Sequence, residues 1–190
     1  MTPPGRRALR TALLERRQAV AAGVRRAWDA RITEHLLRAF PIRAPLVVGF
    51  YWPMRAEFDP RPAIRAWRQA GAQAALPVVL AKGQALEFRA WWPGAPTRKA
   101  VFDLPEPHGT PVLRPDVLLM PPLGFDAAGY RLGYGGGFYD ITLATMDPQP
   151  LKVGVGYELS RLDSIDPLPH DVPMDIVITE AGVFPAPWPR

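Results

Sequence analysis

Apolar residues near the start of the chain recur at the spacing of an α-helix. They predict one helix over residues 6–21 and a second over residues 24–39, with Gly23 as the break between them. Pro41 follows the second helix, where a helix is expected to stop. The positions that would form the two apolar stripes are Leu9, Leu13, Leu14, Val20, Val24, Trp28, Ile32 and Leu36.

Beyond these helices, the chain alternates between apolar runs and helical segments. Continuous apolar runs are typical of strands that are buried on both faces. Two further helices are predicted, one over residues 137–146 and one that ends near Gly71, with Asp59 as its N-cap and Pro60 as its first residue. The predicted strands are residues 46–51, 75–80, 86–91, 116–120, 152–157 and 175–179.

This alternation predicts a single α/β domain over residues 1–190, with a mostly parallel sheet and helices on both faces. The Pro- and Gly-rich stretch 93–115 is expected to be an ordered loop, and residues 184–190 an extended tail. In such sheets the ligand crevice lies at the carboxyl ends of the strands. Tyr51 and Trp52, which follow the first strand, are expected at that edge.

The composition excludes several classes of site. The chain has 190 residues, of which 48% are hydrophobic and 22% charged, so it is expected to fold. It has no cysteine, and its three histidines show no metal-ligand spacing, so disulfides, zinc–thiolate sites and histidine metal sites are not expected. No apolar run is long enough for a membrane span, and no secretory signal pattern is present. We therefore expect a cytoplasmic protein without membrane attachment.

The positive charge is concentrated near the N-terminus. Residues 1–43 carry a balance of +7, whereas the rest of the chain carries −2, which gives the net charge of +5. A basic region of this kind favours an anionic partner such as phosphate, polycarboxylate, nucleic acid or a membrane surface. The alternative is a solvated helical face in a chain that uses Arg far more than Lys, 20 against 3.

The segment most informative about function is glycine-rich and lies between a predicted strand and a predicted helix. Backbone N–H groups at the start of a helix can cradle an anion, and glycines let the main chain approach a ligand closely. Arg131 adds donors for phosphate oxygens, and Asp140 is a candidate Mg²⁺ ligand. The pattern lacks the GK[ST] ending of a Walker loop. The alternative is a glycine-rich turn in which Phe138 and Tyr139 serve as core contacts.

This segment resembles the RLGxGxGYYD signature of the 5-formyltetrahydrofolate cyclo-ligase family, and it reads RLGYGGGFYD at residues 131–140. The resemblance extends over nearly the whole chain. The family's N-terminal K-x-x-x-R is matched by Arg6 and Arg10, and its substrate-binding glutamate by Glu57 in the segment after the first strand. Its aromatic loop is matched at residues 101–105, and an aspartate before a hydrophobic strand at Asp175.

The resemblance implies ATP- and Mg²⁺-dependent conversion of 5-formyltetrahydrofolate, with or without a polyglutamate tail, to 5,10-methenyltetrahydrofolate, ADP and phosphate. The formyl oxygen would be phosphorylated, N10 would attack the activated carbon, and phosphate would leave. Arg131, Asp140 and Glu57 would carry catalysis, and Asp140 with Asp175 would hold Mg²⁺, with Asp171 and Asp166 as rivals. The implied ATP-binding residues are Arg6, Arg10, Arg131, Leu132, Gly133, Tyr134, Gly135, Gly136, Gly137, Phe138 and Tyr139. The implied folate-binding residues are Trp52, Glu57, Phe102, Tyr134, Gly135, Gly136, Gly137, Phe138 and Tyr139.

Several alternatives remain open at this stage. Arg6 (or Arg7) stands where the family commonly has Lys, and Phe138 replaces a Tyr. Glu57 could be a surface carboxylate, and Asp175 could only cap a turn. The chain could be a non-catalytic folate- or nucleotide-binding relative, an RNA-binding protein on this fold, or a sugar-phosphate isomerase or CoA-transferase of similar fold that needs no ATP. We expect a monomer that acts on small molecules rather than on nucleic acid.

Overall fold

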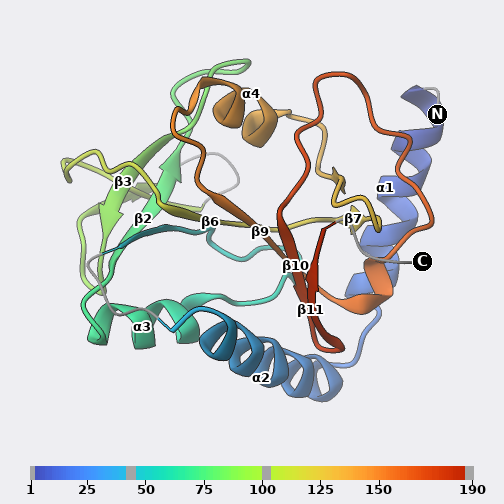
Figure 1. Ribbon diagram of the computed structural model, residues 1–190, viewed down its shortest axis with the longest axis horizontal. Helices are drawn as coiled ribbons and strands as arrows, with labels where there is room; N and C mark the ends of the chain where they lie inside the picture. Colours follow the sequence, from blue (N-terminus) through green and yellow to red (C-terminus); the bar gives the residue numbers. More distant parts are fainter. Residues whose placement is uncertain (1–2, 42–45, 100–103, 187–190) are drawn as a thin grey trace.

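A seven-stranded sheet forms the centre of the computed structural model, which describes residues 3–41, 46–99 and 104–186. The strand order is β11-β10-β9-β6-β1-β2-β3 (Figure 1). The five inner strands are parallel to one another, and the edge strands β3 and β11 are antiparallel to their neighbours. The strands are β1 (Val47–Gly49), β2 (Gln73–Val78), β3 (Glu87–Trp91), β6 (Val117–Met120), β9 (Leu151–Val155), β10 (Ile176–Thr179) and β11 (Gly182–Pro185).

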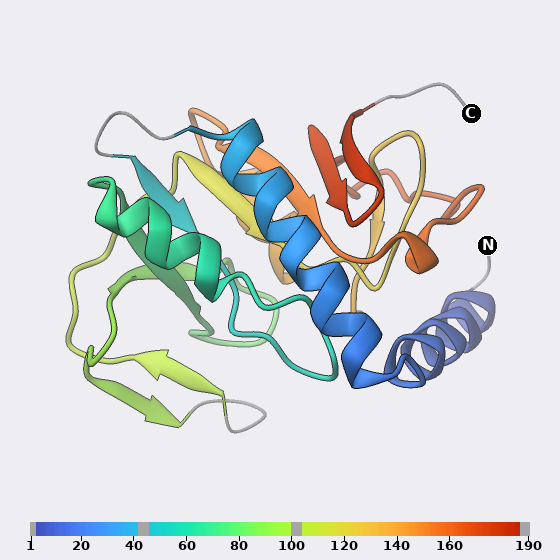
Figure 2. The same ribbon diagram turned by 90° about the horizontal axis from the view of Figure 1, so that it is seen from below.

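Helices cover both faces of this sheet. The helices α2 (Ala22–Ala39) and α3 (Arg61–Gln69) lie on one face, and α4 (Phe138–Thr145) lies on the other (Figure 1). The N-terminal helix α1 (Pro3–Gln18) lies beyond the N-terminal end of α2 (Figure 2). The predicted mostly parallel sheet with helices on both faces is therefore confirmed.

The core follows from the alternation of side chains along the strands. In β6, Leu119 packs toward α2 and α3, whereas Leu118 and Met120 pack toward Leu143 of α4. Both faces of β6 are buried, which explains why its sequence is a continuous apolar run. Gly49 in the neighbouring β1 allows close packing, because a Cβ there would lie 2.8 Å from Pro115.

Three short hairpins were not expected from the sequence. The stretch 93–115, expected as a loop, contains β4 (Thr97–Lys99) paired with β5 (Pro105–Pro107). The glycine-rich segment begins with a hairpin of β7 (Gly124–Phe125) and β8 (Arg131–Leu132). The edge strand β11 forms the third with β10. The strands β4, β5, β7, β8 and β11 lack the continuous apolar runs that mark the inner strands of the sheet, so backbone pairing defines them instead.

The ends of two predicted elements differ from expectation. Helix α3 begins at Arg61 with Pro60 as its N-cap, so the helix starts one residue later than predicted and Asp59 precedes the N-cap. Asp59 still assists the helix start, because its Oδ1 accepts a hydrogen bond from the Arg61 N–H at 3.0 Å. The expected tail from residue 184 begins inside β11, and residues 187–190 lie outside the described part of the chain.

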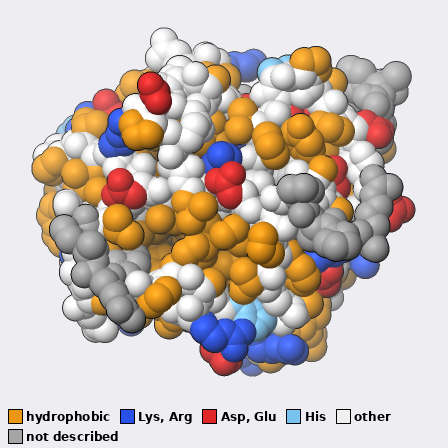
Figure 3. Space-filling model, viewed as in Figure 1, with side chains coloured by type: hydrophobic (Ala, Val, Ile, Leu, Met, Phe, Trp, Pro, Cys, Tyr) orange, Lys and Arg blue, Asp and Glu red, His pale blue; other side chains and the backbone are white. Residues whose placement is uncertain are grey.

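The basic N-terminal helix does not present all its charge to solvent. Arg6 and Arg17 of α1 are buried, whereas Arg7 and Arg16 are exposed. On the face shown in Figure 3, apolar side chains gather across the middle, and basic side chains form small separate groups. Within the described residues, no helix is both long enough and apolar enough to cross a membrane.

Candidate active site

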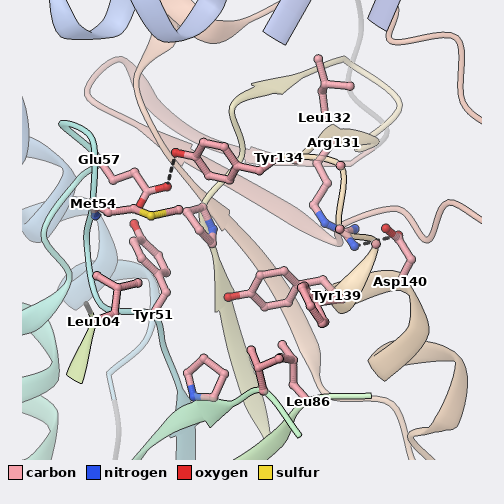
Figure 4. A pocket seen from close by; sticks show the side chains of 18 of the residues that line it. Tyr51, Met54, Glu57, Leu86, Leu104, Arg131, Leu132, Tyr134, Tyr139 and Asp140 are labelled. Atoms are coloured by element: carbon pink, nitrogen blue, oxygen red, sulfur yellow. Dashed lines mark hydrogen bonds and ion pairs between the residues drawn. The ribbon is translucent and has the colours of Figure 1, made fainter. Parts of the chain in front are cut away.

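A cavity of about 610 Å³ lies beside the carboxyl ends of β1, β2 and β6. The connections after these strands, the N-terminus of α4 and the helix α1 all contribute to its walls. Glu57 and Tyr134 lie on one side of it, and Arg131 with Asp140 on the other (Figure 4). Its apolar lining includes Met54, Leu76, Pro77, Val79, Leu86, Leu104, Pro121 and Leu168. The crevice therefore occupies the edge of the sheet that the strand order predicts.

The glycine-rich loop enters the cavity between β8 and α4. All residues from Arg131 to Asp140 line it. Gly137 is the N-cap of α4 and has a left-handed backbone, with φ of +66°. Gly135 also has a positive φ, +98°, and a Cβ there would lie 3.5 Å from the guanidinium carbon of Arg10. The left-handed backbone therefore favours glycine at both positions, and the 3.5 Å distance at Gly135 is ordinary van der Waals contact.

Arg131 and Asp140 clamp the two ends of this loop. Arg131 donates one hydrogen bond to Asp140 Oδ1 at 2.7 Å and another to the Val172 carbonyl at 2.6 Å. Asp140 Oδ1 also accepts the Val172 N–H at 3.0 Å. The clamp holds a cation and a carboxylate side by side at the helix start, where a phosphate and its counterion could compete for them.

The helix α1 brings two further arginines to the same wall. Arg10 Nε donates to the Gly133 carbonyl at 2.8 Å, and Arg6 pairs with Asp171 at 2.9 Å. Burial lowers the pKa of Arg10, and the nearby positive charge of Arg6 lowers it further, while Asp171 opposes both. In the described part of the chain, Arg6 Nε is buried without a hydrogen-bond partner. This side of the cavity is therefore ready to accept negative charge.

Glu57 is a buried carboxylate, not a surface one. The residue is only 8% exposed, and its Oε2 accepts the Met54 N–H at 2.9 Å. Its Oε1 accepts the Tyr134 hydroxyl at 2.8 Å and lies 3.8 Å from Arg17 Nη2. Burial raises the pKa of Glu57, against the opposing effect of these partners. The carboxylate is thus fixed in orientation at the cavity wall and could receive a pair of N–H donors from a ligand.

Aromatic side chains complete the walls. Trp52 lines the cavity and also packs against Trp91 of β3, with ring centroids 6.0 Å apart, so it contributes both to the core and to the cavity wall. The Tyr139 hydroxyl points toward the middle of the cavity (Figure 4). Burial and the charge of Glu57 raise the pKa of Tyr139, so the phenol stays protonated and can donate.

Asp175 is not brought together with Asp140. It lies at the amino-terminal end of β10, whereas the cavity is beside the carboxyl ends of the parallel strands, and it does not line the cavity. Its carboxylate accepts the Lys152 N–H at 2.8 Å and pairs with Lys152 Nζ at 3.0 Å. The prediction that Asp175 joins Asp140 at a metal site is therefore corrected: Asp175 joins the start of β10 to the start of β9.

The rival carboxylate Asp171 does line the cavity, beside Arg6. Burial alone would raise the pKa of Asp171, but hydrogen bonds from the Leu168 N–H and Arg6 outweigh it and lower this pKa. The other rival, Asp166, offers its carbonyl oxygen to Arg6 at 2.7 Å. Among the described side chains, no cluster of three or more His, Asp or Glu could hold a metal ion.

One predicted wall residue cannot be placed, and one further residue was missed. Phe102 lies outside the described residues, but Leu104 and Pro105 from the same segment line the cavity. Tyr51, expected at this edge of the sheet, lines the cavity, whereas Arg17, which contacts Glu57 behind the cavity wall, was not predicted as a site residue. A signal for Arg17 existed, because Arg6, Arg10, Leu13 and Arg17 recur at helical spacing along one face of α1.

Comparison with known proteins gives one consistent family. Residues 3–180 match the model of the 5-formyltetrahydrofolate cyclo-ligase family. The chain is 32% identical over 188 residues to the 5-formyltetrahydrofolate cyclo-ligase of Mycolicibacterium smegmatis, covering 94% of this chain and 95% of that protein. It is 27% identical over 187 residues to the enzyme of that name from Haemophilus influenzae, covering 94% of this chain and 100% of the relative.

A solved structure agrees. The 5,10-methenyltetrahydrofolate synthetase of Aquifex aeolicus superposes with a TM-score of 0.83 at 25% identity, over 97% of this chain and 94% of that one. The match to the family model covers far more than half of the sequence, including the glycine-rich loop, Glu57, Arg6 and Arg10. The chain therefore belongs to the 5-formyltetrahydrofolate cyclo-ligase family.

Proposed function

We propose that this chain converts 5-formyltetrahydrofolate and ATP to 5,10-methenyltetrahydrofolate, ADP and phosphate. One observation carries the proposal: a single cavity joins an oriented, buried carboxylate to a wall of arginines and loop N–H groups. The first suits the hydrogen-bond donors of a pterin ring, and the second suits phosphate. The two substrates must meet for phosphoryl transfer, and one shared cavity lets them do so.

The folate side is supported by Glu57 and the aromatic walls. A carboxylate whose orientation is fixed by Met54 and Tyr134 can accept the paired N–H groups of the pterin edge. Trp52 and Tyr139 offer ring faces and edges to a flat heterocycle. Binding the pterin here would direct its formyl group into the cavity, toward the loop.

The nucleotide side is supported by the glycine-rich loop. Its glycines and the first turn of α4 expose backbone N–H groups, and Arg10 and Arg131 supply fixed positive charge. These groups would bind the ATP phosphates and neutralise the charge that develops during transfer. Positioning and electrostatic stabilisation carry most of the catalysis in reactions of this type.

The chemistry then follows in three steps. The formyl oxygen attacks the γ-phosphorus, the bond to the β-phosphate oxygen breaks, and ADP leaves. N10 attacks the activated formyl carbon and closes the ring. The carbon–oxygen bond breaks with release of phosphate and loss of the N10 proton, which leaves the methenyl cation. The formyl oxygen therefore ends in the phosphate, and no external oxidant or reductant is needed.

We also propose Mg²⁺ as the counterion of the ATP phosphates. Mg²⁺ commonly takes only one or two protein carboxylates and otherwise phosphate oxygens and water, so the single carboxylate of Asp140 at the start of α4 fits it. The ion would offset phosphate charge during transfer. Asp140 would hold it, and Asp171 is a further carboxylate of the cavity wall.

A monomer is sufficient for this activity. All groups assigned to the two substrates come from one chain, and α1 closes the cavity from the same chain. We propose that the protein acts as a monomer on small molecules.

Absorbance of the methenyl product tests the proposal. Purified protein is mixed with 5-formyltetrahydrofolate, ATP and Mg²⁺, and each component is omitted in turn. Product should form only in the complete mixture, in equal amounts with ADP. Binding of folate without product in the complete mixture would favour the non-catalytic relative, and product formed without ATP would contradict the proposal outright.

A further inference from the structure

A buried guanidinium lies at the end of α1, behind the wall of the cavity. Arg17 is only 2% exposed, and it is not one of the described residues that line the cavity. An arginine is seldom buried to this extent unless it is paired, because removing a charge from water is costly. The phosphate-binding role proposed for the glycine-rich loop, Arg6 and Arg10 does not explain why Arg17 is buried. Its contacts therefore indicate what it does.

The contacts of Arg17 all lie in the two segments that form the proposed substrate sites. Its Nη2 donates to the Tyr134 hydroxyl in the glycine-rich loop and lies 3.8 Å from Glu57 Oε1. Its Nε donates to the Arg55 carbonyl at 3.2 Å. Arg17 thus joins the loop assigned to the nucleotide to the segment assigned to the folate.

The hydrogen-bond chemistry gives this contact a direction. A guanidinium can only donate, so the Tyr134 oxygen must accept from Arg17. The one hydroxyl hydrogen of Tyr134 is then committed to Glu57 Oε1, 2.8 Å away. Met54 N–H holds the other oxygen. Arg17 therefore sets the orientation of the Glu57 carboxylate without touching the cavity.

The backbone around Glu57 also needs support. Arg55 and Ala56 both have left-handed φ angles, +48° and +61°, which are unfavourable for residues with a side chain. Arg17 binds the carbonyl oxygen of Arg55, inside this strained turn. Loss of the contact would let the turn relax and would move Glu57 away from its present position.

We infer that Arg17 is a positioning residue for folate recognition, which acts through Tyr134 and Glu57. The inference rests on the proposed function, because it takes Glu57 to be the group that binds the pterin. It assigns no contact between Arg17 and either substrate. The expected signature is a defect in folate binding that leaves ATP binding largely intact.

The charge environment of Glu57 supplies a second signature. Burial raises the pKa of this carboxyl, whereas the Met54 N–H, the Tyr134 hydroxyl, Arg17 and Arg55 lower it. The other titratable groups that face it are the phenols of Tyr51 and Tyr139, which stay protonated at neutral pH. Without Arg17 the opposing effects weaken, so the pKa of Glu57 rises further. Folate binding by the variant should then fail at a higher pH than in the parent protein.

The test compares Arg17→Met, Arg17→Lys and Arg16→Met in the full chain. The first removes the charge at similar size, the second keeps charge without the fork, and the third removes a neighbouring exposed arginine of the same helix. Circular dichroism and thermal melting establish folding. Steady-state kinetics give KM for 5-formyltetrahydrofolate and for ATP, and calorimetry without nucleotide gives folate affinity across pH.

Arg17→Met should raise KM for the folate by about tenfold or more, while KM for ATP changes little. The pH at which folate binding is lost should move up by about one unit. Arg17→Lys, which keeps the charge, should show much smaller changes in both KM and pH dependence. Arg16→Met should match the parent. Equal losses for both substrates, or an unmoved pH dependence, would overturn the inference and leave Arg17 a structural residue.

Tyr134→Phe keeps the test decisive if Arg17→Met fails to fold. This change removes only the hydroxyl that joins Arg17 to Glu57, so it should lower folate affinity more than Arg17→Lys does. Normal folate affinity in Tyr134→Phe would overturn the inference. A parent protein that forms product while Arg17 variants bind folate normally would overturn the inference alone. A parent protein that neither binds folate nor forms product would overturn the proposed function and the inference with it.

Discussion

Arg131 Nη2 lies 2.7 Å from Asp140 Oδ1, so the strand before the glycine-rich loop is joined directly to the helix after it. Both residues face the cavity, and the Val172 backbone binds each of them. Ten residues of chain are thereby held as one unit around the proposed phosphate site. The loop can be rich in glycine and still keep a defined shape, because its ends are fixed by an ion pair.

Asp140→Asn tests the role of the carboxylate charge. Asn keeps an oxygen that can accept the hydrogen bonds of Arg131 and the Val172 N–H, so the loop should keep its shape. We expect turnover to fall by about a hundredfold, with a higher Mg²⁺ requirement and normal folate binding. Mg²⁺ titration of turnover and calorimetry with folate measure these effects. Near-normal activity at low Mg²⁺ would remove Asp140 from the proposed metal site.

Glu57→Gln tests the folate side separately. The amide keeps the shape of the carboxylate but loses its charge and presents a donor where the pterin needs an acceptor. Folate affinity should fall by about tenfold to a hundredfold, and affinity for ATP should stay close to that of the parent. Calorimetry with each ligand alone separates the two effects. An equal loss for ATP would place Glu57 in the nucleotide site instead.

The pH dependence of folate binding follows from the environment of Glu57. Burial raises the pKa of this carboxyl, so on acidification it takes up a proton earlier than an ordinary glutamate, whose pKa is about 4.3. Only the ionised form accepts two N–H donors, so binding should be complete at neutral pH and be lost as the pH falls through the raised pKa. Calorimetry across pH without nucleotide measures this, which avoids titration of the ATP phosphates. If Glu57→Gln kept the same pH dependence, another group would be responsible.

Gly135→Ala and Gly71→Ala form a matched pair. Both glycines have nearly the same left-handed backbone, with φ of +98° and +99°, so alanine should cost each about 1–2 kcal/mol of stability. A Cβ would make only ordinary van der Waals contact with Arg10 at Gly135 and no contact within 4 Å at Gly71, so the two sites differ chiefly in that Gly135 lies in the loop that lines the cavity. Only Gly135→Ala should raise KM for ATP, by several-fold, which corresponds to about 1 kcal/mol of binding free energy.

Thermal melting of the two variants checks that the stability losses are similar. A raised KM for ATP in both variants would show that general destabilisation, rather than a distorted glycine-rich loop, affects nucleotide binding.

The central fold was predictable because its inner strands lie in continuous apolar runs. The run at residues 117–120 is hydrophobic without interruption, and β6 is buried on both faces. The hairpin of β4 and β5 was not predictable, because its strands are three residues long and carry no apolar period. The same limit applies to β7, β8 and β11.

The candidate site was predictable where several residues contribute to one local motif. The segment from Arg131 to Asp140 lines the cavity as a unit. The metal-site prediction for Asp175 was wrong because the sequence shows only that this carboxylate precedes a strand. The direction of β10 in the sheet places Asp175 at the edge away from the cavity. Arg17 was overlooked because its partners, Glu57 and Tyr134, lie far away in sequence.

The fate of the formyl oxygen tests the central claim, that this cavity brings the formyl group of the folate against the γ-phosphate of ATP. The substrate is 5-formyltetrahydrofolate labelled with oxygen-18 in the formyl group, and released phosphate is analysed by mass spectrometry after complete conversion. We predict that each phosphate carries one labelled oxygen, because the carbon–oxygen bond breaks after phosphorylation. Unlabelled phosphate alongside full formation of methenyl product and ADP would contradict the account, because ATP would then be cleaved without direct transfer to the folate.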